Sequence, residues 1–184
     1  MSFYSNKWRN ITVSGKAASG STTLARGLAE KTGWKMFSGG EMVREYMKKN
    51  GISLAETNKS PDEFHVKLDN FIKDKLKNES QRIIESWLAG YDAIGIAGVF
   101  KILVVCEDDS VRIDRLVNRD KMTIEKAKEH LRIREKENME KWEKLYKTAD
   151  FWNPVNYDLV IDTYRNGPLQ TLETALESLG YSSL

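Results

Sequence analysis

Short apolar runs alternate with segments of helical periodicity along this chain, which is the pattern of a parallel α/β sheet. Five runs have the length and composition of strands: Ile11–Val13, Lys35–Phe37, Arg82–Glu85, Phe100–Val105 and Tyr157–Asp162. The later runs are continuously apolar, as in strands that are covered by helices on both faces. We therefore expect a five-stranded parallel sheet flanked by helices.

Amphipathic segments separate the predicted strands, and we expect helices over Leu24–Lys31, Gly40–Lys49, Pro61–Asn78, Thr123–Tyr146 and Pro168–Leu179. The third of these begins well, because Ser60 is a good N-cap and proline suits the first helical position. Its apolar residues recur at helical spacing and predict one buried stripe made of Phe64, Leu68, Phe71, Ile72 and Leu76.

Two connecting regions are less regular. The composition of Gly51–Lys59 predicts a turn or loop. Thr123–Tyr146 carries many charges and few large apolar residues, which is typical of a solvated helix. A flap that closes over a phosphate site has the same composition, because its basic face has no partner until substrate arrives. Both interpretations stay open at this point.

Composition limits the partners that the chain can have. Its 184 residues predict a single domain, and 29 basic against 27 acidic residues give a net charge of +2, which favours neither nucleic acid nor a membrane surface. The lone Cys106 predicts a buried thiol in a reducing compartment. No stretch has membrane-spanning length, and Met1–Arg9 lacks the apolar segment of a signal peptide, so we expect a cytoplasmic protein. His65 and His130, expected at the surface, lack the spacing of a zinc site.

The loop between the first strand and the first helix resembles G-x-x-x-x-G-K-[ST], with glycines at Gly15 and Gly20. Such a loop surrounds a phosphate with backbone N–H groups at the positive end of a helix dipole. Thr22 stands at the hydroxyl position that ligates Mg²⁺, but Ser21 stands where the pattern has lysine. A tight turn of small residues is the alternative. The predicted ATP phosphate site comprises Gly15, Lys16, Ala17, Ala18, Ser19, Gly20, Ser21, Thr22 and Thr23.

Polar residues also follow the second and third strands, at the sheet edge where ligands of α/β proteins collect. Ser38 and Arg44 come after the second strand, and Arg44 could donate two hydrogen bonds to one phosphate. Glu85 ends the third strand and could hold Mg²⁺ directly or through water. A surface arginine and a carboxylate paired with lysine are the alternatives. Asp69, on the long helix, would reach a base or ribose, or be solvated.

Four motifs in order resemble the archaeal type of cytidylate kinase: Ile-Thr-Val-Ser-Gly-x-x-x-Ser-Gly-x-Thr-Thr-x-Ala-Arg from Ile11, Phe-Ser-Gly-Gly-Glu-x-x-Arg-Glu from Phe37, Leu-Ala-Gly from Leu88 and Tyr-Asp-Leu-Val-Ile-Asp-Thr from Tyr157. The resemblance covers about Asn10 to Leu179. It implies a P-loop NTPase-like three-layer fold and phosphoryl transfer from ATP, with Mg²⁺, to a nucleoside monophosphate, with CMP or dCMP favoured. It also implies a core (8–37, 80–118 and 156–184), a monophosphate-binding segment (38–79) and a lid (119–155).

The same resemblance implies roles for individual residues. Ser38, Gly39 and Arg44 would bind the monophosphate, and Asp69 would help to hold the nucleotide. The lid arginines that grip the transferring group match Arg119, Arg132 and Arg134.

This chain departs from the family pattern in ways that affect charge. Ser21 stands at the position of the loop lysine, where members of the family commonly carry threonine. Trp87 stands where the family has an arginine that contacts phosphate, and His65 stands where aspartate is common. Lys16 follows the first glycine and could restore the missing positive charge. It could do so within its own chain or across a dimer, so a monomer and a homodimer both stay open. Because a lost preorganised donor costs about a hundredfold to a thousandfold in rate, a weak or inactive nucleotide-binding relative is the first alternative. A small-molecule kinase is the second.

Overall fold

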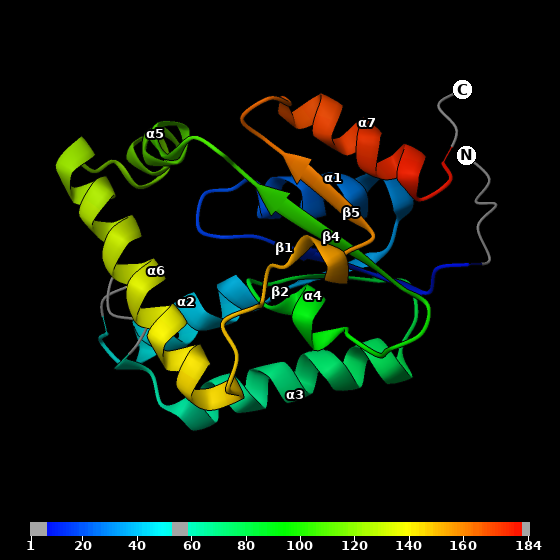
Figure 1. Cartoon of the computed structure of the whole chain (residues 1–184), viewed down its shortest axis with the longest axis horizontal. Helices are drawn as coiled ribbons and strands as arrows, with labels where there is room; N and C mark the ends of the chain where they lie inside the picture. The colour runs from blue at the N-terminus through cyan, green and yellow to red at the C-terminus, as the bar shows by residue number, and fades with distance from the viewer. Residues whose placement is uncertain (1–6, 53–58, 182–184) are drawn as a thin grey trace.

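The computed structural model describes residues 7–52 and 59–181, and its centre is a five-stranded parallel sheet (Figure 1). The strands are β1 (Asn10–Ser14), β2 (Lys35–Ser38), β3 (Arg82–Glu85), β4 (Val99–Val105) and β5 (Leu159–Asp162), in the spatial order β2-β3-β1-β4-β5. All five predicted strands are confirmed. The last begins two residues later than predicted, because Tyr157 caps a 3₁₀ turn (η2, Pro154–Asn156) by donating its backbone N–H to Pro154.

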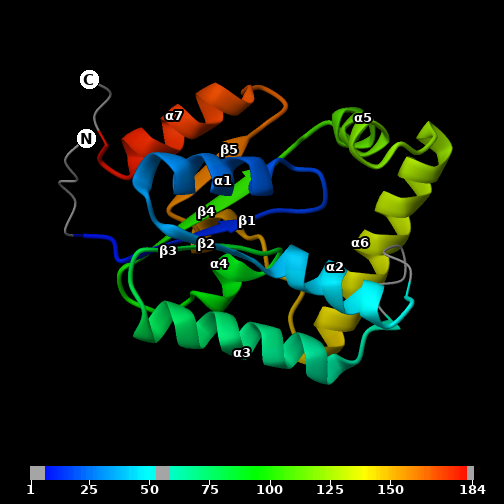
Figure 2. The ribbon, with the colours of Figure 1, turned by 180° about the vertical axis from the view of Figure 1, so that it is seen from behind.

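Helices cover both faces of the sheet, and the two layers bury separate clusters (Figures 1 and 2). On one face lie α1 (Ser21–Thr32) and α7 (Pro168–Ser178), and on the other lie α3 (Asp62–Asn78) and α4 (Ala89–Asp92). The side chains of β1 and β4 that face α1 are fully apolar, as strands between two helical layers require. The cluster beneath α1 and α7 includes Ile11, Val13, Leu24, Leu28, Ile102 and Ile161, and that beneath α3 includes Leu68, Ile72, Leu76 and Ile84.

Helix α3 differs from its prediction in two details. It begins at Asp62 with Pro61 at the N-cap, and no side chain caps it. Ser60 instead places its Oγ atom 2.6 Å from Nε2 of His65, which is buried, so the predicted surface position of His65 is wrong. Phe71 is 41% exposed, because it lies at the side of the stripe rather than on it and packs against Phe37.

Three helices lie beyond the carboxyl ends of the strands: α2 (Gly39–Lys49), α5 (Asp109–Asp120) and α6 (Ile124–Tyr146). Helix α6 extends along one side of the molecule from α5 to the start of α3 (Figures 1 and 2). It is not a freely solvated helix, since Leu131 and Trp142 are buried against the rest of the chain. Helices α4 and α5 were not predicted. Among the described helices, none combines the length and apolar character needed to span a bilayer.

Candidate active site

The loop from Gly15 to Gly20 connects β1 to α1 and needs glycine at both ends. A Cβ atom at Gly15 would lie 2.4 Å from Oγ of Ser19 and 2.6 Å from the carbonyl oxygen of Val104, so a side chain cannot fit. Gly20 has a φ of 103°, in the left-handed region that favours glycine. No side chain caps α1 and its first turn contains no acidic residue. The N–H groups of this turn are therefore available to a phosphate.

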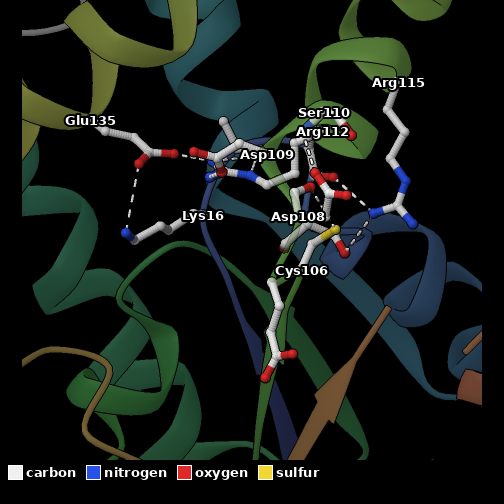
Figure 3. A network of polar contacts seen from close by, with 12 residues as sticks. Lys16, Cys106, Asp108, Asp109, Ser110, Arg112, Arg115 and Glu135 are labelled. Carbon is white, nitrogen blue, oxygen red and sulfur yellow. Dashed lines mark hydrogen bonds and ion pairs between the residues drawn. The ribbon is translucent and has the colours of Figure 1, made fainter. Parts of the chain in front are cut away.

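Two arginines of α5 bind the loop from its outer side. Nε and Nη2 of Arg112 donate to the carbonyl oxygen of Ala17 at 3.0 and 2.9 Å. Nη1 of Arg115 donates to the carbonyl oxygens of Ala18 and Ser19 at 3.0 and 3.2 Å. Figure 3 shows both arginines reaching the loop from α5. Because these hydrogen bonds hold the carbonyl groups toward α5, they fix the loop in one conformation. The sequence analysis did not identify either arginine.

Glu85, at the end of β3, accepts hydrogen bonds from three hydroxyl groups. Ser21 and Thr22 donate to its Oε1 atom at 3.0 and 3.2 Å, and Ser38 donates to Oε2 at 2.6 Å. The carboxyl end of β3 therefore brings together the loop and the start of α2, as predicted. Ser21, at the lysine position of the pattern, is 6% exposed and directed into this network rather than toward solvent.

This network has the oxygen ligands that suit Mg²⁺. The hydroxyl of Thr22 and the carboxylate of Glu85 lie within 3.2 Å of each other and would hold the ion, with phosphate oxygens and water completing its coordination. The described residues contain no group of three or more His, Cys, Asp or Glu side chains placed for a metal. The donor set therefore fits an ion that arrives with a nucleotide rather than one held by protein ligands alone.

A cavity of about 490 Å³ opens above the loop. It is lined by Gly20, Ser21 and Thr22 and by arginines from α1, α2, α5 and α6. Arg44, Arg119 and Arg134, three of the arginines predicted to bind phosphoryl groups, all line this cavity. It is also lined by residues after β5 that had no predicted role: Thr163, Asn166 and Pro168. Thr163 is the last residue of the motif that begins at Tyr157. Its hydroxyl donates a hydrogen bond to the carbonyl oxygen of Ser19 at 2.6 Å.

Arg134 occupies the most enclosed position among these arginines. Burial lowers its pKa to about 10, with further contributions from the positive charges of Arg119 and Arg44. Within residues 7–52 and 59–181, Arg134 forms no ion pair, and its Nε atom is buried without a hydrogen-bond partner. Arg119 and Arg44 repel this guanidinium, and Asp120 and Glu85 attract it without forming an ion pair with it. An enclosed guanidinium with an unpartnered donor is a group that an anionic ligand would bind.

A smaller cavity adjoins the first and shares Arg134 with it. Gly39, Gly40 and Asp69 line this second cavity, together with Asn138 and Trp142 of α6. Asp69 accepts a hydrogen bond from the hydroxyl of Tyr146, and burial raises the pKa of its carboxyl. Asp69 is 6% exposed, so the alternative of a solvated aspartate is wrong.

Lys16 and Arg132 lie outside both of these cavities. The Nζ atom of Lys16 is 3.6 Å from Oε2 of Glu135 on α6, and Figure 3 shows the side chain pointing toward that carboxylate. Lys16 lines a third cavity with Cys106, which is half-buried rather than fully buried as predicted. Arg132 is 63% exposed and pairs with Glu129 one turn earlier in α6.

Known proteins similar to this chain identify its family. Residues 10–165 match the model of the cytidylate kinase-like family. The chain belongs to this family. It is 32% identical to the cytidylate kinase of Haloarcula marismortui over 92% of this chain and 88% of that one, and 33% identical to that of Methanothrix thermoacetophila over 92% and 96%. The fold is similar to that of shikimate kinase from Acinetobacter baumannii, with a TM-score of 0.58, 15% identity and 92% of each chain covered.

Membership of the cytidylate kinase-like family confirms the predicted resemblance, the P-loop kinase fold and the enzyme class, a nucleoside monophosphate kinase. The geometry adds which residues line the cavities. Of the predicted arginines, Arg44, Arg119 and Arg134 line the main cavity, whereas Arg132 does not. Serine stands at the lysine position of the loop, and the basic residues that line the main cavity with the loop are arginines of α1, α2, α5 and α6, together with His130.

Proposed function

We propose that this cytidylate kinase-like chain transfers the γ-phosphoryl group of ATP to CMP or dCMP, with Mg²⁺, at the boundary between the two cavities. The observation that carries the proposal is the position of Arg134, which lines both the cavity above the loop and the cavity around Asp69. A phosphoryl group that passes from a nucleotide in the first cavity to one in the second must cross this boundary.

The donor nucleotide occupies the larger cavity in this proposal. Its phosphates bind the N–H groups of the loop and of the first turn of α1. Thr22 and Glu85 hold the Mg²⁺ ion, which neutralises charge on the β- and γ-phosphates when bound. The region between Arg119 and Asn166 receives the adenosine part.

The acceptor binds at the smaller cavity, with its phosphate toward Arg44 in the larger one. The smaller cavity measures only about 40 Å³, so α6 must move outward before a nucleotide fits. Gly39 lets the start of α2 pack closely on the segment after β3, since a Cβ atom there would lie 2.9 Å from Oγ of Ser86. Ser38 orients Glu85 through its 2.6 Å hydrogen bond. The Asp69 carboxylate is a suitable acceptor for the exocyclic amino group of cytosine, which uracil lacks.

The reaction needs alignment and charge neutralisation more than covalent catalysis. An oxygen of the acceptor phosphate forms a bond to the γ-phosphorus, the bond to the β–γ bridging oxygen breaks, and ADP leaves with that electron pair. Arg44, Arg119 and Arg134 stabilise the charge on the transferring group, and α6 excludes water. Three of the predicted cations are already paired. Arg119 can act only if its two hydrogen bonds to Asp120 open, Arg132 only if its ion pair with Glu129 opens, and Lys16 only if its pair with Glu135 opens.

The test is a coupled assay of ADP release with ATP, Mg²⁺ and CMP, dCMP, UMP or AMP. We expect turnover with CMP and dCMP, and slower turnover with UMP and AMP. Absence of ADP release with all four acceptors refutes the proposal. Calorimetry then shows whether the chain still binds ATP and CMP, the behaviour expected of an inactive relative.

Three predictions from the sequence extend this proposal. The division into a core, a monophosphate-binding segment over 38–79 and a lid over 119–155 places α2 and α3 in the second part and α6 in the third. A cytoplasmic location and a monomer or homodimer complete the proposal. Fractionation of cells and light scattering of the purified chain test the last two.

A further inference from the structure

The indole ring of Trp87 lies against the guanidinium group of Arg134. The Cζ atom of Arg134 is 5.1 Å from the centroid of the ring, a cation–π distance. Trp87 comes from the segment directly after β3, and Arg134 comes from the middle of α6. This contact therefore connects the lid to the carboxyl edge of the sheet beside Glu85.

An aromatic face supports an arginine in a way that a carboxylate cannot. The ring attracts the cation through its quadrupole but accepts none of the guanidinium N–H donors in its plane. An acidic partner would bind these donors and neutralise the charge that a phosphoryl group needs. Arg134 is half-buried near Arg44 and Arg119, and the indole offsets part of its desolvation cost. The ring takes up none of its N–H donors, and Nε has no hydrogen-bond partner at this edge of the cavity.

Trp87 is itself fixed by two other tryptophans. Its ring contacts that of Trp142 edge-to-face, with centroids 5.4 Å apart. Nε1 of Trp152 donates to the carbonyl oxygen of Trp87 at 2.9 Å. A large planar side chain held at its edge and at its backbone provides a rigid surface for the arginine.

We propose that Trp87 is a positioning residue that holds Arg134 at the boundary between the two cavities, with its N–H donors toward the transferring phosphoryl group. The inference rests on the proposed function, because it assigns Arg134 to that reaction. It also gives the tryptophan a role in catalysis rather than only in packing.

The test compares Trp87→Leu and Trp87→Phe with Arg134→Met and the double variant Trp87→Leu/Arg134→Met. We expect Trp87→Leu to lower kcat about tenfold, since a desolvated cation–π contact is worth about that factor. The KM for ATP should change much less, and Trp87→Phe, which keeps an aromatic face, should recover most of the rate. In the Arg134→Met background, Trp87→Leu should cost no further activity.

A matched control separates positioning from packing. Tyr91 belongs to the same aromatic cluster, packs against Phe151 with ring centroids 5.0 Å apart, and lines neither of the two cavities. Tyr91→Leu should lower the melting temperature and leave kcat unchanged in an assay run well below it. Full kcat in Trp87→Leu, or an equal loss in both Arg134 backgrounds, overturns the inference. An inactive parent chain refutes the proposed function instead, so the two failures are distinguishable.

Discussion

Lys16 and Glu135 face each other on the outer side of the loop, with 3.6 Å between Nζ and Oε2 (Figure 3). The pair joins α6 to the loop, and neither residue lines the main cavity. Glu135 also accepts a hydrogen bond from Arg112, which holds the carbonyl oxygen of Ala17. One carboxylate of α6 therefore contacts both a loop lysine and the arginine that orients the loop.

The first prediction concerns Lys16. Its side chain is 47% exposed, so the ion pair contributes well under about 1 kcal/mol to stability. We expect Lys16→Gln to lower kcat less than about tenfold, because removing a donor that contacts the reacting charge costs about a hundredfold or more. Steady-state kinetics with ATP and CMP measure this. A loss of a hundredfold would show that Nζ leaves Glu135 and reaches a phosphate in the loaded enzyme.

The second prediction concerns Glu85 and Mg²⁺. Glu85→Gln keeps the size of the side chain but removes the charge that would hold the ion. We expect the Mg²⁺ concentration for half-maximal rate to rise at least about tenfold and kcat to fall about a hundredfold. Glu107→Gln, at an exposed carboxylate paired with Arg165, is the control and should behave as the parent. An unchanged Mg²⁺ titration in Glu85→Gln would remove Glu85 from the metal site.

The third prediction concerns Arg112, which is 4% exposed. Arg112→Met leaves the carbonyl oxygen of Ala17 without its donor and Glu135 with only Lys16, which should cost about 2–3 kcal/mol of unfolding free energy. Denaturant unfolding measures the loss. Asp109→Asn removes the exposed carboxylate that pairs with the same arginine, and should cost less than about 1 kcal/mol. Equal losses in both variants would contradict the assignment.

The fourth prediction concerns pH. Burial and the neighbouring Asp69 carboxylate raise the pKa of Asp92 from 3.8 to about 8, against the lowering effect of Lys73, whose Nζ lies 3.3 Å from Oδ1. The folded chain therefore keeps a proton that the unfolded chain releases, and the unfolding free energy should fall as pH rises from about 4 to 8, with a slope of up to about 1 kcal/mol per pH unit. Above pH 8 this contribution levels off.

Asp92→Asn cannot ionise and should lack this slope, so its stability relative to the parent should increase from pH 5 to pH 8. Denaturant unfolding at a series of pH values provides the measurement. Asp74→Asn, at an exposed carboxylate on α3, should keep the parental slope. A parental slope in Asp92→Asn as well would show that Asp92 is ionised in the folded chain.

Local patterns were sufficient to predict the sheet and the loop. The apolar runs at β1, β3 and β4 predict strands because each of these strands lies between helices and buries both faces. Gly15 and Gly20 predict the loop because its geometry leaves no room for a Cβ atom at one position and requires a positive φ at the other. Ser38, Glu85 and Arg44 were found because parallel strands deliver their carboxyl ends to one edge.

Contacts between distant segments were decided only by the tertiary structure. The periodicity of α3 places Phe71 beside the buried stripe, but the exposure of that side chain depends on where the neighbouring layer ends. No local signal connects Arg112 to Ala17, or Trp87 to Arg134, because each pair joins elements that meet only after the sheet and the lid are assembled. The sequence by itself therefore determined the fold, the loop and the class of reaction. Only the packing of α5 and α6 against the sheet determined which cations reach the site, since charge acts through distance in space.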